Sequence, residues 1–170
     1  KQTEAKRLVA RYGGNPDACT ALWVKYSLDY FLQSSPDEIA WQTRKILDSA
    51  PGDLPLVAIR PLTARGSTEI LIYAHDDPRL FARTTALLDQ LGLSILDARV
   101  MTTDDGMTVN AYQVLDQDGS PVNDPDRLLE LREGLETDLR ERPSGGIAVA
   151  RSLPRRHRHF PTETRVSFSA

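Results

Sequence analysis

The chain has 170 residues, of which 40% are hydrophobic and 26% are charged, and its formal net charge at pH 7 is −3. This composition is typical of a globular protein with a packed core, and it excludes a general electrostatic attraction to nucleic acid or to membranes. No apolar run approaches the roughly 20 residues that span a bilayer, so we expect no membrane partner. The single cysteine excludes an internal disulfide and indicates a reducing, cytoplasmic location.

Residues 1–50 are predicted to form a helical segment. Residues 2–12 are rich in helix formers, and Gly13 would end that helix. A second helix is predicted over residues 16–33, because Asn15 can cap it ahead of a proline at its first position.

A third helix has the strongest start signal in the chain. Ser35 is the expected cap, Pro36 occupies the first position, Glu38 closes a capping box, and the pattern ends near Ser49. The apolar faces of three such helices are too small for a full core, so we expect the tail of a preceding helical domain. Because the chain begins at Lys1, we also expect a fragment of a longer protein.

Residues 51–67 have the composition of a linker. Within them, Leu54–Leu62 is apolar and favours a β-strand, but it contains Pro55 and Pro61. Proline cannot donate a ladder hydrogen bond, so this stretch is predicted to be an edge strand or an extended arm.

Residues 68–170 show the periodicities of an α+β domain. Strands are predicted at 68–74, 94–103, 107–115 and 164–168, and helices at 78–91 and 126–142. This βαββαβ order predicts a ferredoxin-like fold, a four-stranded antiparallel sheet with two helices on one face.

The predicted faces of these elements follow from their spacing. In the first strand Ile70, Ile72 and Ala74 point one way, and Glu69, Leu71 and Tyr73 point the other. In the second strand the residues predicted to point inward are Leu96, Ala98 and Val100. The first helix has a core stripe of Leu80, Phe81, Thr84, Leu87, Leu88 and Leu91.

Two possible reactive sites are rejected because the sequence lacks the further residues that each would need. The pair His75–Asp76 could suggest a metal phosphohydrolase, but the only other histidines are His157 and His159, in a basic connector. Cys19 has no histidine near it in sequence and lies in a helical pattern, so it is predicted to be a small packed side chain.

Two further patterns also have simpler explanations. Gly66–Ser67 could open a nucleotidyltransferase site, but no Asp-x-Asp pair follows on a strand, and the adjacent pairs Asp76–Asp77 and Asp104–Asp105 fit turns. The basic run 151–159 lacks interleaved aromatic residues and is predicted to be a solvated linker rather than a nucleic-acid site.

The remaining candidate is the turn His75–Leu80, ahead of the first ferredoxin-like helix. Free backbone N–H groups at a helix start can receive a carboxylate, and we expect them at Asp77, Arg79 and Leu80. An α-ammonium group could meet Asp76, Asp77 or Asp97. The alternative is that Asp76 or Asp77 only caps the helix, which spacing alone favours.

Two stretches of this region, residues 76–82 and 91–100, resemble the signature of ACT domains. The resemblance covers Thr68 to Ala170. It implies a ferredoxin-like module that binds a small ligand, often an amino acid, and regulates an attached enzyme. The chain departs from the pattern at Arg79, where glycine is usual, and at Ser94, where asparagine is common.

A narrower resemblance is carried by residues 35–43, 60–61, 66–70 and 102–106. These are similar to the C-terminal region of the bacterial PII uridylyltransferase/uridylyl-removing enzymes, which carry a nucleotidyltransferase domain, a metal-dependent HD domain and two glutamine-sensing ACT domains. The helical segment would then join the HD domain to the first ACT domain.

The resemblance implies a non-catalytic, glutamine-sensing module without a cofactor of its own, within a parent enzyme that uses Mg²⁺. Its implied amino-acid site consists of His75, Asp76, Asp77, Arg79, Leu80 and Asp97. The implied partners are a second ACT domain or a second copy, and the PII signalling protein through the full-length parent. The alternative is an ACT–ACT interaction module that binds no metabolite, which Arg79 in the turn favours.

Overall fold

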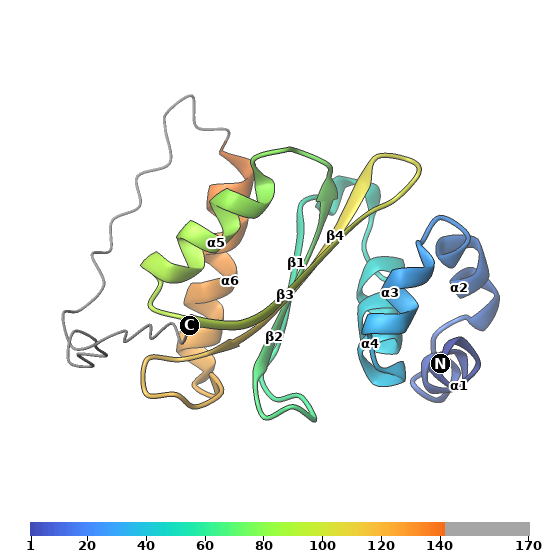
Figure 1. Ribbon diagram of the computed structural model, residues 1–170, viewed down its shortest axis with the longest axis horizontal. Coiled ribbons are helices and arrows are strands. Elements are labelled where there is room, and N and C mark those ends of the chain that lie inside the picture. The colour runs from blue at the N-terminus through green and yellow to red at the C-terminus, as the bar shows by residue number, and fades with distance from the viewer. Residues whose placement is uncertain (142–170) are drawn as a thin grey trace, which may run out of the picture.

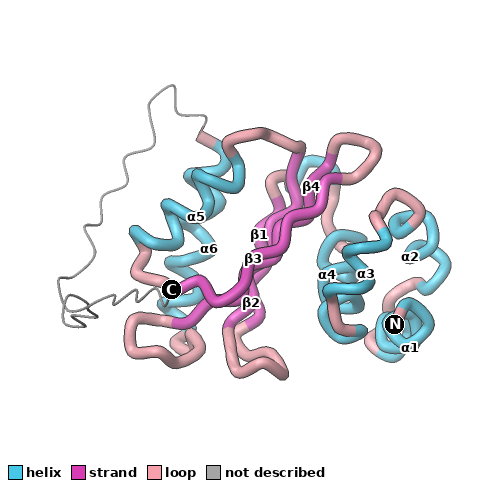
Figure 2. Tube along the Cα trace, in the orientation of Figure 1, coloured by secondary structure: helices cyan, strands magenta, loops and turns pink. Residues whose placement is uncertain are grey.

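A computed structural model describes residues 1–141 as a four-stranded antiparallel sheet between two layers of helices (Figures 1 and 2). The first layer, called the helical layer below, contains α1 (Gln2–Arg11), α2 (Pro16–Trp23), α3 (Leu28–Gln33) and α4 (Pro36–Leu47). After a short 3-10 turn, η1 (Pro51–Asp53), the sheet contains β1 (Leu56–Arg60), β2 (Thr68–His75), β3 (Ser94–Thr102) and β4 (Met107–Leu115). The second layer contains α5 (Leu80–Gln90) and α6 (Pro125–Arg140). The predicted α+β class is confirmed.

The strand order is β1-β2-β4-β3, so the order β2-α5-β3-β4-α6 reproduces the first five elements of the predicted βαββαβ unit. The sixth, the strand predicted at 164–168, lies outside the described residues. In that unit the last strand would pair with the first, here β2. Within the described residues this position belongs to β1, which pairs antiparallel with β2 from Leu56↔Tyr73 to Arg60↔Glu69.

The edge strand predicted between the two prolines is confirmed as β1. Pro55 and Pro61 lie just outside its ends, Leu56 and Arg60. Neither proline therefore interrupts the ladder, and the strand keeps all of its pairing with β2.

The helical layer differs from the prediction in one respect. The single helix predicted over residues 16–33 is wrong, because the chain forms two helices, α2 and α3, with a break that ends at Ser27 in an extended conformation. The break lets aromatic rings in and beside it meet edge to face. Between ring centroids, Trp23 of α2 lies 5.7 Å from Phe31 of α3, and Tyr26 in the break lies 4.9 Å from Tyr30 of α3. This packing outweighs the helical spacing of the same residues.

Both faces of the sheet are buried, each against its own helices. Between the sheet and the helical layer lies a core that includes Val9, Trp23, Phe31, Ile39, Leu71, Met101 and Val109. Between the sheet and the second layer lies a core that includes Ile70, Ile72, Leu88, Tyr112, Leu131 and Leu135. The alternation predicted for β2 is thus confirmed, and the four leading helices share their core with the sheet.

The edge strand β3 departs from its predicted pattern. Of its three residues predicted to point inward, Ala98 packs against the core, but Leu96 and Val100 are 59% and 50% exposed. A register shift between Ile95 and Asp97 turns Leu96 outward, and β3 has no neighbour beyond it among the described residues.

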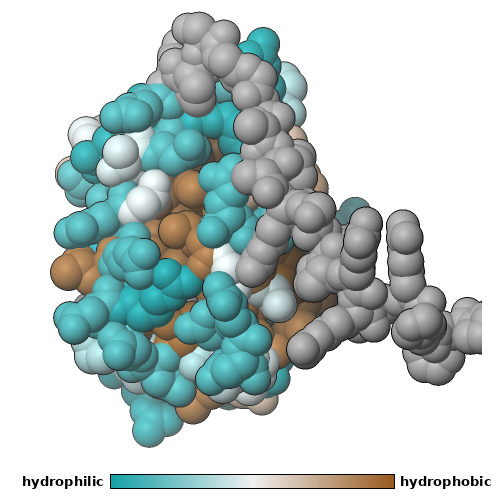
Figure 3. All heavy atoms as spheres, turned by 90° about the vertical axis from the view of Figure 1, so that its left-hand side faces the viewer, coloured by the Kyte–Doolittle hydropathy of each residue, from teal (hydrophilic) through white to brown (hydrophobic). Residues whose placement is uncertain are grey.

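Apolar side chains are also exposed on the second layer. Phe81 on α5, predicted to lie in the core stripe, is 45% exposed, and Leu129 on α6 is 44% exposed. Hydrophobic side chains gather among hydrophilic ones on the face that α5 and α6 form (Figure 3).

The carboxylate of Glu38 connects the helical layer to the sheet. The predicted capping box is confirmed, because Ser35 Oγ accepts a hydrogen bond from Glu38 N and Glu38 Oε2 accepts one from Ser35 N at 2.7 Å. The same buried carboxylate lies 3.0 Å from Arg65 Nε and 3.3 Å from Arg99 Nη1 of β3. Gln113 of β4 also donates to it. One side chain therefore caps α4 and binds three groups of the sheet domain.

A second buried carboxylate, Glu69 of β2, makes a parallel connection. It accepts hydrogen bonds from Gln42 of α4 and Arg60 of β1, and Arg60 also pairs with Asp37 and lies over the ring of Trp41. Burial raises the pKa of Glu69, and the opposing effects of Arg60 and Gln42 do not cancel that rise.

The pKa of Glu38 is shifted in the opposite direction, downward. Burial alone would raise its pKa, but the Ser35 N–H group, Arg99 and Arg65 together hold it below the ordinary value of 4.5. The unfolded chain then binds more protons than the folded one between the two pKa values. This contribution to stability is complete above the unfolded value and is lost as the pH falls through the folded pKa.

We therefore expect Glu38→Gln to lower the free energy of unfolding at pH 7 by about 1–3 kcal/mol, because a neutral amide cannot replace the buried carboxylate that pairs with Arg65 and Arg99. The variant should also lose less stability than the wild type between pH 5 and pH 3, measured by urea unfolding. Glu133→Gln is the matched control, because Glu133 is exposed on α6. Equal losses for the two variants would contradict the role given to Glu38.

Candidate functional site

The predicted turn His75–Leu80 joins the end of β2 to the start of α5. Asp77 organises it: its Oδ1 accepts a hydrogen bond from Arg79 N at 2.8 Å, and its carbonyl accepts one from Leu80 N at 2.9 Å. The prediction that the Arg79 and Leu80 amides are free is therefore wrong. The prediction that Asp76 or Asp77 caps the helix is also wrong, because the N-cap of α5 is Arg79 and the helix has no side-chain cap hydrogen bond. Asp77 closes the turn just ahead of it.

The neighbouring residues of the turn remain more open. Asp76 N donates to the carbonyl of Gly106, so the backbone of the turn is tied to the β3–β4 hairpin. The side chains of His75, Asp76 and Arg79 are exposed, whereas Leu80 is buried in the core. Asp76 thus presents a carboxylate to solvent from a fixed backbone.

The structure does not bring Asp97 to this turn. Along β4, Asp97 pairs in register with Gln113, whereas His75 pairs with Met107, six residues away. At about 3.3 Å per residue this separation is roughly 20 Å. Asp97 instead accepts hydrogen bonds from Arg99 Nε and Nη2 at 2.9 and 2.8 Å, on the side of the helical layer.

A hollow of about 500 Å³, called the turn hollow below, lies beside the turn. It brings together three segments that are distant in sequence, and its walls carry both acidic and basic groups. Its lining consists of Leu54, Pro55, Ala74, His75, Asp76, Asp77, Pro78, Leu80, Arg83, Leu139 and Arg140. Such a mixture of charges suits a zwitterion better than an ion of one sign.

Arg83 is the part of this hollow that sequence reasoning missed. Its Nη2 binds Asp138 Oδ2 and the carbonyl of Glu141, both at 3.1 Å, and so ties α5 to the end of α6. Its Nε is buried without a hydrogen-bond partner among the described residues. Such a donor is costly to bury unpaired, so it is suited to an acceptor that residues 1–141 do not supply.

The alternatives rejected from sequence have ordinary structural roles. Cys19 is fully buried, and burial raises the pKa of its thiol, which keeps it protonated at neutral pH. Ser67 is also buried and donates to Gln113 Oε1 at 2.6 Å. Within residues 1–141, no three His, Cys, Asp or Glu side chains gather closely enough to hold a metal ion. None of the helices in that range is long and apolar enough to cross a membrane.

Comparison with known proteins shows which enzymes this chain is similar to. Residues 1–45, most of the helical layer, match the family described as uridylyltransferase GlnD fifth domain. The bifunctional uridylyltransferase/uridylyl-removing enzyme of Methylococcus capsulatus is 41% identical over 165 residues, which are 97% of this chain and 19% of that protein. The enzymes of that name from Stutzerimonas stutzeri and Azotobacter vinelandii are 39% and 41% identical over 94% of the chain, with 18% of each enzyme covered.

The chain thus spans about a fifth of the length of the curated relatives that it matches. The match extends through the helical layer and the sheet domain, and it agrees with the resemblance found in the sequence. The chain is therefore similar to one part, about a fifth in length, of the bifunctional uridylyltransferase/uridylyl-removing enzymes, and its first 45 residues match the fifth domain of that family.

Proposed function

We propose that this part of the enzyme is a regulatory module that binds glutamine or another small amino acid and performs no chemistry itself. The observation that carries the proposal is the turn hollow, which is lined by both Arg83 and the exposed Asp76. Arg83 has an unpaired Nε among the described residues, and Asp76 presents a carboxylate. A free amino acid has the complementary pair of groups.

In this arrangement Arg83 donates to the α-carboxylate and Asp76 accepts from the α-ammonium group. His75 and Arg140 line the same hollow and are placed to contact the ligand side chain. Asp77 contributes by fixing the turn through its bond to Arg79 N. Asp97 lies in a separate cluster, so we leave it out of the proposed site.

A ligand regulates only through different affinities for two arrangements of the protein. Residues 1–45 match a domain of the uridylyltransferase, and they rest on the same sheet whose other face carries α5 and the turn. We propose that glutamine binding changes the arrangement of this module within the parent enzyme. The parent would act on the PII protein with Mg²⁺ in its catalytic domains, and this module would need no cofactor.

Isothermal titration calorimetry of the chain with glutamine tests the proposal. We expect a saturable heat, and we expect Asp76→Asn to weaken binding by tenfold or more, because a hydrogen bond to a charged group contributes about 1.5–3 kcal/mol. Asp104→Asn in the β3–β4 turn is the matched control and should bind as the wild type does. Absence of heat with glutamine, glutamate and glycine would overturn the proposal.

A second candidate function, docking of another copy of the module, is favoured by the open edge of β3. This nine-residue strand has no partner beyond it in the described part of the chain, and it exposes Ile95, Leu96 and Val100. A long edge strand with exposed apolar side chains is suited to pairing with another strand. On this alternative the module binds no metabolite.

Analytical ultracentrifugation separates the two candidates. If β3 pairs between copies, the chain sediments as a dimer, and Val100→Lys shifts it to monomer by placing a charge in the contact. Val24→Lys is the control, because Val24 is 78% exposed and lies in the helical layer rather than on β3. A wild-type chain that stays monomeric over the accessible concentrations would contradict the docking function.

A further inference from the structure

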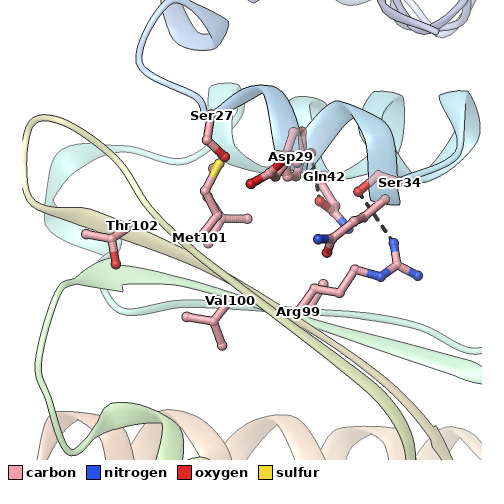
Figure 4. A pocket seen from close by; sticks show the side chains of 12 residues that line it. Ser27, Asp29, Ser34, Gln42, Arg99, Val100, Met101 and Thr102 are labelled. Atoms are coloured by element: carbon pink, nitrogen blue, oxygen red, sulfur yellow. Dashed lines mark hydrogen bonds between the residues drawn. The ribbon is translucent and has the colours of Figure 1, made fainter.

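A second hollow lies between the helical layer and the sheet, and we call it the α3/β3 cleft (Figure 4). Its volume is about 250 Å³. Its lining is largely polar and includes Ser27, Asp29, Tyr30, Ser34, Gln42 and Arg99. At about 30 Å³ per water in the liquid, the cleft has room for roughly eight waters or one small metabolite.

The two ends of the cleft carry opposite charges. Arg99 and Ser34 meet at one end, and Asp29 and Ser27 lie farther along it (Figure 4). Asp29 is exposed and has no ion-pair or hydrogen-bond partner among the described residues, so its carboxylate is available to an ammonium group.

At the other end Arg99 is held but not saturated. Its Nε and Nη2 make short bonds to Asp97, whereas its Nη1 makes long ones, 3.3 Å to Glu38 and 3.4 Å to Ser34 Oγ. Contacts of this length are weaker than ordinary hydrogen bonds of about 2.9 Å. A ligand oxygen can therefore bind Nη1 without displacing the bonds that orient the guanidinium group.

The floor of the cleft is fixed before any ligand arrives. Gln42 is 1% exposed, accepts a hydrogen bond from Tyr30 at 2.8 Å and donates to Glu69 at 2.7 Å. Both polar ends of its amide are thus engaged, and the side chain cannot turn to fill the cleft. A preorganised polar floor lowers the entropic cost of binding a small ligand.

We propose that the α3/β3 cleft is a second site for a small zwitterion, a free amino acid whose ammonium group meets Asp29 and whose oxygen at the other end meets Arg99. Along α3, Asp29 and Ser34 are five residues apart, about 7.5 Å at the helical rise, which an extended amino acid of the length of glutamine bridges and glycine does not. The inference rests on the proposed function, because it takes the same class of ligand.

Unlike the turn hollow, the cleft lies between the helical layer and the sheet, so a ligand there contacts both. One wall is α3 of the helical layer, and the other is β3 of the sheet. A ligand that contacts both walls favours the arrangement in which the two layers are packed together. Occupancy of the cleft is then coupled directly to the part of the chain that matches the fifth domain.

Thiol labelling tests whether glutamine occupies the cleft, separately from whether the chain binds glutamine at all. Ser27→Cys places a thiol in the cleft at an exposed position whose side chain makes no cap hydrogen bond, and the only native cysteine, Cys19, is fully buried. At glutamine concentrations ten times the calorimetric dissociation constant, labelling of Ser27→Cys by a maleimide should slow about tenfold, because only the unliganded fraction reacts. Glycine should protect much less than glutamine.

Two controls test whether the protection is specific to the cleft. Asp104→Cys, in the β3–β4 turn, should label at the same rate with and without glutamine. Adding Asp29→Asn to Ser27→Cys should remove the protection. Labelling of Ser27→Cys that glutamine does not slow, in a chain that binds glutamine by calorimetry, overturns the cleft and leaves the proposed function standing. A chain that gives no glutamine heat overturns both.

Discussion

The buried carboxylate of Glu38 is the constraint on which the arrangement of the layers depends. It closes the capping box of α4 and at the same time neutralises Arg65 and Arg99, which come from the opposite side of the interface. A buried charge is tolerated only when it is paired and hydrogen-bonded, so α4 and the sheet must keep one relative position for all of these bonds to form. The second carboxylate, Glu69, repeats the arrangement with Gln42 and Arg60. The apolar core between the layers supplies the larger area of contact, and the two carboxylates specify how it is aligned.

Local signals in the sequence predict most of the individual elements. The capping box at Ser35 and the alternation of β2 each depend on a few neighbouring residues, and the structure agrees with them. The spacing of α5 correctly places Leu80 and Leu88 in the core but not Phe81. The break between α2 and α3 could not be predicted in this way, because it results from aromatic packing across the break rather than from a turn residue. The pairing of β1 with β2 depends on long-range register, and its flanking prolines indicate only that the strand lies at an edge.

The candidate site is less predictable than the fold, because it depends more on contacts between residues that are distant in sequence. The turn from His75 to Leu80 is local, and its position at a strand–helix junction follows from the sequence. The hydrogen bonds that Asp77 makes within the turn then occupy the amides of Arg79 and Leu80. Arg83 is bound to Asp138 because α6 returns along α5, and Asp97 is held on the other face by Arg99 and Arg65. Which side chains gather around a turn is thus decided by the packing of elements that are distant in sequence.

Both proposed ligand sites lie against the same sheet, which connects each of them to the rest of the module. The turn hollow lies on the α5 side and the α3/β3 cleft on the side of the helical layer, so a ligand at either site contacts the unit that Glu38 holds together. Native-state hydrogen exchange of the whole chain tests this unity most directly. The account predicts that the slowest amides of α4 and of β2 exchange with the same opening free energy, because the layers open together. Exchange of α4 with a much lower opening free energy than β2 would contradict it, since the helical layer would then open while the sheet stays folded.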